Sequence, residues 1–458
     1  PAMAGQATET SPLIEEPRKK GDVLATLRLG ATSGAGLVAD GYDLQVVNLV
    51  MAIMAHTFPD KMGPGAKSFA ATTTLVGVIV GQVTFGALAD VIGRKLASIL
   101  TASLTIVGAA LSACVVDTTG FSIAMQLGLC RLLLGLGIGG EYPLSAAIGK
   151  EAEGKRLICS RSQLLCFNMF LYNCGAVFQA LFVTIMLVAS VPLAVIWRVA
   201  LAGGVVPSLV AVSLRFLMEE PEARAQERRA AEELRDGRAP GYFTNLASQV
   251  GSRWTIMLGA CLSWFLFNFT AYGHGAFASL ICDRLLGSEK ESDIVLVKRD
   301  AVFSLIMGGL NVLGTLIGIA LDGRLSLRTI QANCFLLMAV PLWIIGALNG
   351  SAQSGSSPWL AVLYMFCVFM MPFVGITTYL VPTESFPASA RGTCVGIAAA
   401  SGKLGGVVGT ALFPIWEHRY GLNMVLVTSG CVSLMGAFVT LLLTPDTRPS
   451  QKGHSQKE

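Results

Sequence analysis

Two oppositely charged side chains lie inside one apolar segment of the sequence. Arg131 and Glu141 are ten residues apart, and only leucine, isoleucine and glycine separate them. At helical rise this spacing is roughly 15 Å along one helix. Charged residues inside membrane-spanning segments usually serve a function, and the glycines allow a neighbouring backbone to approach closely. The segment therefore predicts a helix that lines a path through a membrane protein.

Three further charged residues occupy apolar stretches, namely Asp40, Asp43 and Lys403. Counted at about 1.5 Å per residue from the ends of their segments, Asp40, Glu141 and Lys403 all reach roughly the middle of a bilayer. A lysine at that depth is costly unless it meets an anion or an acid, which favours an anionic substrate. Buried carboxyl groups can load and release a proton near neutral pH. We expect an anion site beside proton-exchanging acids.

Each of these residues also has a purely structural explanation. Asp43 could cap or hydrogen-bond a neighbouring helix instead of exchanging a proton. Lys403 could extend along its aliphatic stem toward the membrane surface. Arg131 and Glu141 could form a static ion pair that ties the protein together.

Trp264, Asn268 and Tyr272 follow one another at intervals of four residues. On a helix this spacing places them in one stripe. Tryptophan, an amide and a tyrosine on one stripe suit the wall of a polar cavity. The alternative is an aromatic packing face with a single amide that bridges two helices.

The composition places the whole chain among membrane proteins. Of 458 residues, 53% are apolar and 14% are charged, whereas a soluble domain has about 25% charged residues. Apolar runs near the length needed to cross a bilayer recur about twelve times. They cover residues 31–55, 70–89, 97–116, 122–149, 163–190, 192–217, 254–281, 301–321, 328–349, 358–381, 393–415 and 422–443. The predicted fold class is an all-α integral membrane protein.

A charged stretch after the sixth run predicts a linker between two six-helix halves. The expected division is an N-terminal tail 1–28, a half 29–217, a linker 218–253, a half 254–443 and a C-terminal tail 444–458. Basic residues gather in the short connections after even-numbered runs. By the positive-inside rule these connections, the linker and both tails face the cytoplasm.

An internal repeat supports two matched halves. Asp90 and Arg94 follow the second run, and Asp322 and Arg324 follow the eighth, at an offset of 232 positions between the two aspartates. Glu151 and Arg156 are echoed in the same way by Glu384 and Arg391. Parallel repeats of this kind are typical of transporters that work by alternating access.

Several other functions are excluded by the sequence. The net charge of +4 is explained by the cytoplasmic flanks, and no nucleic-acid motif is present. The eleven cysteines lie mostly within the apolar runs and show no metal-ligand spacing, so we interpret them as free thiols. Without a nucleotide loop or a nucleophile triad, the chain is not expected to be an enzyme or to hold a cofactor or metal.

The loop Gly86–Lys95 and the glycine-rich helix that begins at Arg131 resemble hallmarks of the major facilitator superfamily, and the resemblance covers essentially the whole chain. Three separate segments, Asp40–Asn48, Gly139–Ser145 and Ala400–Gly405, are similar to the phosphate/proton symporter family. The resemblance implies twelve helices in two pseudo-symmetric halves with a site between them.

The resemblance also implies roles for individual residues. Substrate binding falls to Tyr142, Phe170, Trp264, Asn268, Tyr272, Gly375 and Lys403, and proton coupling to Asp40, Asp43 and Glu141. The expected gate residues are Asp90, Arg94, Arg131, Glu151, Arg156, Asp322, Arg324, Glu384 and Arg391.

This chain departs from the family pattern at four of these positions. Asn268 and Glu141 replace family aspartates, Gly375 stands where the family has an asparagine, and Phe170 falls near a family glutamine. A pocket that loses polar ligands and gains a phenyl ring would favour a larger, partly apolar anion. The Asp-Gly-Tyr-Asp sequence that begins at Asp40 is also similar to that of aromatic-acid/proton symporters.

We therefore expect a proton-coupled symporter of a small anion, with inorganic phosphate as the first candidate. The alternative is a proton-coupled carrier of an organic anion, either a carboxylate or an organophosphate. A third hypothesis is a nutrient sensor that does not transport, but gate motifs in both halves argue against it. The predicted setting is the plasma membrane, where a monomer suspended in the lipid bilayer would be functional.

Overall fold

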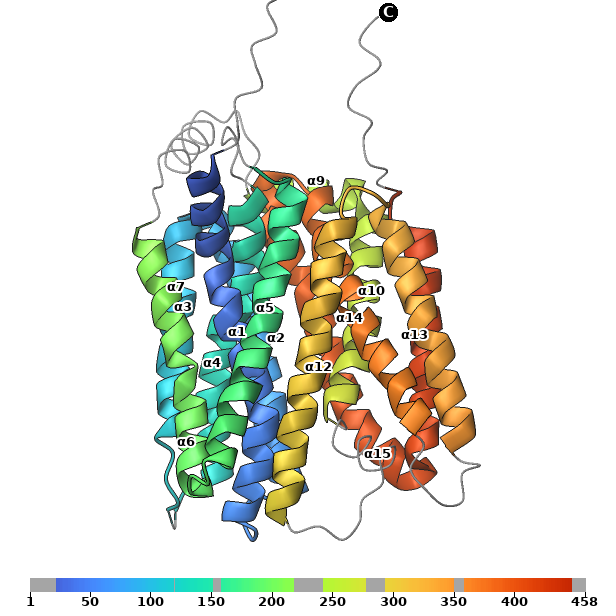
Figure 1. The fold of residues 1–458 in the computed structure, drawn as a ribbon. Helices are drawn as coiled ribbons and strands as arrows, with labels where there is room; N and C mark the ends of the chain where they lie inside the picture. The colour runs from blue at the N-terminus through green and yellow to red at the C-terminus, as the bar shows by residue number, and fades with distance from the viewer. Residues whose placement is uncertain are drawn as a thin grey trace, which may run out of the picture.

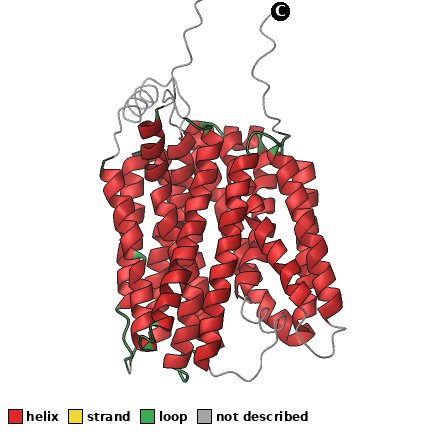
Figure 2. Ribbon diagram, viewed as in Figure 1, coloured by secondary structure: helices red, strands yellow, loops and turns green. Residues whose placement is uncertain are grey.

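Twelve helical spans make up the part of the protein that the structure describes. The computed structural model describes residues 22–118, 120–150, 158–217, 242–276, 293–349 and 358–446, and over these residues all regular structure is helical (Figure 1, Figure 2). Twelve of the described helical segments are long and apolar enough to cross a membrane. The predicted all-α membrane fold and its number of spans are thereby confirmed.

The first six spans come from seven helices. These are α1 (Val23–Thr57), α2 (Pro64–Ile92), α3 (Arg94–Ala113), α4 (Ile123–Lys150), α5 (Arg161–Val188), α6 (Leu193–Gly203) and α7 (Val205–Phe216). The last two are joined at Gly204 and form one span. The Asp22 side chain caps α1 by accepting from the backbone N–H groups of Leu24 and Ala25 at 2.9 and 3.1 Å. The first helix therefore begins inside the predicted N-terminal tail.

The last six spans follow a short helix. The elements are α9 (Tyr242–Ser252), α10 (Trp254–Ala276), α12 (Asp293–Leu321), α13 (Leu327–Asn349), α14 (Pro358–Ser385) and α15 (Ala388–Leu443). The chain turns inside α15 at Gly421, whose φ of 80° favours glycine, so α15 supplies two spans. Helix α9 lies within the predicted linker, and residues 218–241 of that linker are outside the described residues.

Both described ends of the chain lie at one end of the bundle, at the top of Figure 1. We call this the terminal end, because it holds Val23 and Leu443, and we call the other the distal end. Successive spans alternate in direction. The Asp90 and Asp322 loops therefore both lie at the terminal end.

Glycines bring the two halves into close contact near the terminal end. A Cβ added at Gly396 on α15 would meet the backbone of Gln82 on α2, and one at Gly86 would lie 2.8 Å from the Gly392 carbonyl oxygen. Such small residues let helices pack backbone to backbone in a membrane protein, where lipid gives little hydrophobic drive for association.

Candidate functional site

A cavity of about 320 Å³ lies between the two halves. Its inner end is formed by Tyr142, Trp264 and Lys403, and its lining continues to Asn48 and Gly275 toward the distal end. Helices α1, α2, α4 and α5 supply one wall, and α10, α12, α14 and α15 supply the other. Among the described residues that line it, Lys403 is the only one with a full charge.

Lys403 remains inside this cavity, with 4% of the residue exposed. Its ammonium group donates to the Tyr272 hydroxyl. The same nitrogen lies 4.6 Å from the centroid of the Tyr272 ring and 5.4 Å from that of Tyr142, so both rings face the cation. The lysine therefore does not extend to the membrane surface as the structural alternative required.

The predicted stripe on α10 faces the cavity. Trp264, Asn268 and Tyr272 all line it, and the Trp264 ring lies 6.2 Å from the Tyr142 ring across the two halves. Gly375 lines it as well. The predicted cavity wall thus lies where its helical spacing indicated.

Phe170 is predicted to bind substrate, but it is not among the described residues that line this cavity. The α5 residues that line the cavity are Met169, Tyr172, Asn173, Ala176 and Gln179, which share one helical face. Phe170 lies off that face and stacks on Phe167, with ring centroids 5.5 Å apart.

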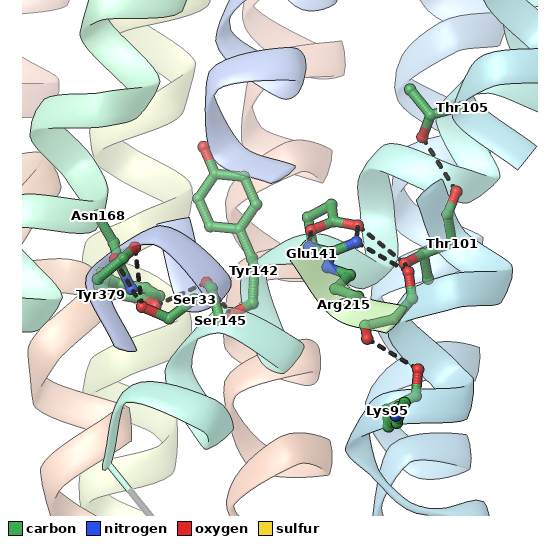
Figure 3. A network of polar contacts seen from close by, with 12 residues as sticks. Ser33, Lys95, Thr101, Thr105, Glu141, Tyr142, Ser145, Asn168, Arg215 and Tyr379 are labelled. Carbon is green, nitrogen blue, oxygen red and sulfur yellow. Dashed lines mark hydrogen bonds and ion pairs between the residues drawn. The ribbon is translucent and has the colours of Figure 1, made fainter. Parts of the chain in front are cut away.

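Glu141 forms a buried ion pair with Arg215 of α7 (Figure 3). One guanidinium nitrogen donates to Glu141 Oε1 at 2.7 Å and to the Ser98 carbonyl at 2.8 Å, and the other contacts Oε2. Thr101 donates to Oε1 at 2.8 Å. Each charged residue of the pair is 1% exposed. The suggested pairing of Glu141 with Arg131 is therefore wrong.

Arg131 lies inside the N-terminal half and not at the interface of the halves. It is fully buried, and its guanidinium donates to the Asp43 carbonyl oxygen at 3.0 Å. This contact ties α4 to α1, so the structure does not support the predicted gate role.

Asp40 and Asp43 are both fully buried, and neither carboxylate has a hydrogen-bond partner among the described residues. Asp40 interacts electrostatically with Glu141, Arg215, Asp43 and Lys403. The Asp43 carboxylate lies against Gly204, where an added Cβ would contact it. In this conformation Asp43 does not cap a neighbouring helix through a described contact.

Together, six charged side chains are buried among the described residues, and with all six ionised their charges cancel. They are Asp40, Asp43, Arg131, Glu141, Arg215 and Lys403. In a low dielectric such a balance is sensitive to one added charge.

The Glu141–Arg215 ion pair requires a glycine at position 36 of α1. A Cβ at this position would clash with side-chain atoms of both partners. We expect Gly36→Ala to lower the free energy of unfolding by about 1–3 kcal/mol. Gly30→Ala on the same helix is the matched control, since its nearest contact would be an ordinary 3.5 Å. Thermal unfolding in detergent measures both. Equal stability of the two variants would contradict the predicted clash.

Matched contacts close the terminal end. Asp90 accepts from the backbone N–H and the hydroxyl of Thr393 at 3.0 and 2.8 Å, at the start of the eleventh span. Asp322 accepts from the hydroxyls of Ser160 and Ser162 at 3.1 and 2.6 Å, at the start of the fifth span. Each aspartate thus joins its own half to the other half.

The remaining predicted gate residues differ in their contacts. Arg94 donates to the Ala388 carbonyl of the other half at 3.4 Å. Arg391 donates to the Thr383 carbonyl at 3.1 Å, and the partly buried Glu384 lies nearby in sequence. Arg324 is exposed, and its side chain makes no hydrogen bond or ion pair with a described residue. Glu151 and Arg156 lie outside the described residues.

A hydrogen bond joins the halves on the terminal side of the cavity, beyond the lining residues Tyr142 and Ile376. The hydroxyls of Ser145 on α4 and Tyr379 on α14 are 2.8 Å apart, and the Tyr379 ring contacts that of Tyr142 at 6.3 Å (Figure 3). Tyr379 is fully buried. The cavity is therefore separated from the terminal end and extends toward the distal end.

We expect Tyr379→Phe to open the terminal end more often, because it removes this hydrogen bond and keeps the ring. A hydrogen bond contributes about 0.5–1.5 kcal/mol, so the populations of the two states should shift about twofold to tenfold. Spin labels at the exposed Val91 and Leu325 would report the distance between the halves at this end. Ser145→Ala should give the same shift, and the double variant no more. If the shifts of the two single variants add up in the double variant, the two hydroxyls do not act through one shared hydrogen bond.

Two matched halves around a central cavity define a transport scaffold. The chain belongs to the sugar (and other) transporter family, whose model matches residues 31–451. It is a multi-pass membrane transporter of the major facilitator type and not an enzyme, as the sequence predicted.

Two relatives and one solved structure illustrate the similarity. Inorganic phosphate transporter PT2 of Toxoplasma gondii is 30% identical over 366 residues, which cover 80% of this chain and 62% of that protein, less than two thirds of its length. Glycerophosphoinositol permease 1 of Candida albicans is 26% identical over 418 residues, which cover 90% and 77%. The proton:xylose symporter XylE matches with a TM-score of 0.72 at 18% identity, over 93% of this chain and 97% of that chain.

Proposed function

We propose that the protein carries inorganic phosphate, or an anion that contains a phosphate group, together with protons by alternating access. The observation that supports this most directly is the charge of the cavity, where Lys403 is the only fully charged residue among those described. A single buried cation without an acid in the same lining attracts an anion. The ammonium group and the Tyr272 hydroxyl together offer donors to phosphate oxygens.

The relatives support a phosphate group as the part of the substrate that is recognised. One is named as an inorganic phosphate transporter and another as a glycerophosphoinositol permease. Phosphate is the chemical group that these two substrates share. We place this group at Lys403, with Tyr142, Trp264 and Asn268 forming the surrounding wall.

We assign proton exchange first to Asp40. Burial of an unpaired carboxylate is costly, and binding a proton removes that cost. Glu141 differs, because Arg215 and Thr101 stabilise its charge in this conformation. When an anion joins the neutral six-residue cluster, a proton on Asp40 restores neutrality. Asp43 and Glu141 would then take part in proton exchange as the halves rearrange.

Transport would proceed by opening one end of the cavity while the other closes. In the described conformation the contacts of Asp90, Asp322 and Tyr379 separate the cavity from the terminal end. Release of substrate at that end requires these contacts to break. Because they join opposite halves, their rupture lets the halves rock apart.

An organophosphate is the second candidate substrate. Cavities of about 300 Å³ and more accommodate ligands much larger than a five-atom oxyanion. Gly375 also leaves part of the wall without a side chain that could close around bare phosphate. Both features favour an anion with a substituent.

We further propose that the terminal end faces the cytoplasm and that the protein acts as a monomer in the plasma membrane. Arg94, Lys95, Arg253 and Arg328 all lie near this end, in agreement with the positive-inside rule. Cavity and gate contacts are both formed within one chain.

Competition in reconstituted vesicles tests the substrate class. Labelled phosphate would be exchanged against internal phosphate while unlabelled sulfate, benzoate, phosphate or glycerol 3-phosphate is added outside. We expect the two phosphate compounds to compete most strongly. Stronger competition by benzoate would favour an organic-acid carrier, and binding of phosphate without any exchange would favour a sensor.

A further inference from the structure

Neutral polar side chains line the cavity between Lys403 and the distal end. They include Asn48, Asn173, Gln179, His274, Ser304 and Asn311. Bare phosphate bound at Lys403 would leave most of these groups without a ligand contact. This part of the cavity therefore has hydrogen-bonding groups that an inorganic anion at Lys403 would not contact.

Two of these side chains have hydrogen-bonding atoms that no described residue satisfies. His274 is 2% exposed, and neither of its ring nitrogens has a hydrogen-bond partner among the described residues. Gln179 is 3% exposed, and its side-chain oxygen is also without a partner in that part of the chain. Buried polar atoms are nearly always paired in native proteins. A ligand in the cavity would supply the missing partners.

The position of these groups fits the outer part of a substrate held by Lys403. His274 follows Tyr272, the partner of Lys403, by two residues, which is about 3 Å further toward the distal end. Gln179 follows Tyr172 by seven residues, which is roughly 10 Å along α5. The His274 ring is fixed by Tyr364 and Phe413, with centroids 5.7 and 6.1 Å away.

We propose that His274 and Gln179 form a second subsite, which binds a neutral, hydroxyl-bearing substituent attached to the phosphate. A neutral imidazole has one donor and one acceptor, an amide has both, and each alcohol group can pair with either. The described lining offers no acid for a cationic substituent. The preferred substrate class is therefore a phosphate ester of a polyol. This assignment rests on the proposed binding of phosphate at Lys403.

Paired ligands test the subsite. Glycerol 3-phosphate and methyl phosphate share the phosphate monoester but differ in two hydroxyl groups. We expect the full-length protein to bind glycerol 3-phosphate about tenfold more tightly. His274→Phe keeps the ring contacts with Tyr364 and Phe413, and Gln179→Leu removes the amide. Each should weaken binding of glycerol 3-phosphate about threefold to tenfold and leave methyl phosphate unchanged.

His274→Asn retains a donor and an acceptor, so it should recover part of the affinity for glycerol 3-phosphate. Equal affinity of the parent protein for both esters would overturn the subsite, as would an equal loss for both in the two substituted proteins. Unchanged binding of methyl phosphate shows that a variant is folded. Lys403→Ala separates the two proposals: if it leaves methyl phosphate binding intact, the phosphate site fails, while a selective loss in His274→Phe would still support the subsite.

Discussion

Lys403→Ala is expected to weaken phosphate binding by about tenfold to hundredfold. A hydrogen bond to a charged group contributes about 1.5–3 kcal/mol, and no other fully charged residue among those described lines the cavity. The substitution also leaves the buried acids with one base fewer, which further disfavours an anion. Isothermal calorimetry on detergent-solubilised protein would measure the dissociation constant directly.

Two variants serve as controls for Lys403. Lys403→Arg keeps the charge and should retain part of the affinity. Lys61→Ala removes a lysine that lies at the distal end and pairs with Asp117 at 2.7 Å, so phosphate binding should not change. If Lys403→Ala binds phosphate as tightly as the parent, the anion site lies elsewhere.

Asp40→Asn should abolish phosphate uptake driven by a pH gradient, because an amide cannot release a proton. Exchange of labelled for unlabelled phosphate should survive, since it needs the halves to rearrange but no net proton movement. The substitution breaks no hydrogen bond to a described residue, because the Asp40 carboxylate has no hydrogen-bond partner among them. Uptake by vesicles with and without an imposed gradient distinguishes the two activities.

Glu141→Gln is a less direct probe of coupling. It would leave the Arg215 charge buried without its partner, which destabilises a protein by several kcal/mol. Asp117→Asn at the surface is the appropriate control for Asp40→Asn, and it should transport normally. Gradient-driven uptake that persists in Asp40→Asn would remove Asp40 from the coupling role.

Hydropathy and helical periodicity were sufficient to predict the fold. Each apolar run became a span, because only a helix satisfies the backbone inside a bilayer. The same periodicity placed Trp264, Asn268 and Tyr272 on the cavity wall. Lys403 was found because a lysine deep in an apolar run has few purely structural explanations.

The burial of Arg215 and its pairing with Glu141 could not be predicted from the sequence. Arg215 lies in the last turn of α7, where an arginine resembles an ordinary basic flank of a span. Its burial depends on the packing of α7 against α1 and α3, which no local pattern reveals. The same limit explains why Glu141 was paired with Arg131, the only basic residue in the apolar run 122–149.

Contacts between the halves could not be predicted from the sequence either. Ser145 and Tyr379 are separated by 234 residues, and neither lies in a motif that predicts their hydrogen bond. Phe170 was assigned by similarity of position, but helix rotation decides which α5 residues face the cavity. That the His274 nitrogens have no hydrogen-bond partner among the described residues can be seen only once the surrounding helices are in place.

The most direct test of the central claim measures phosphate and protons together in one preparation. The purified protein would be reconstituted into vesicles that contain a pH-sensitive dye, with the membrane potential clamped and the outside made acidic. We predict that phosphate accumulates inside, that the interior acidifies only when phosphate is present, and that a protonophore abolishes the accumulation. Phosphate uptake that ignores the gradient and moves no protons would contradict proton-coupled transport.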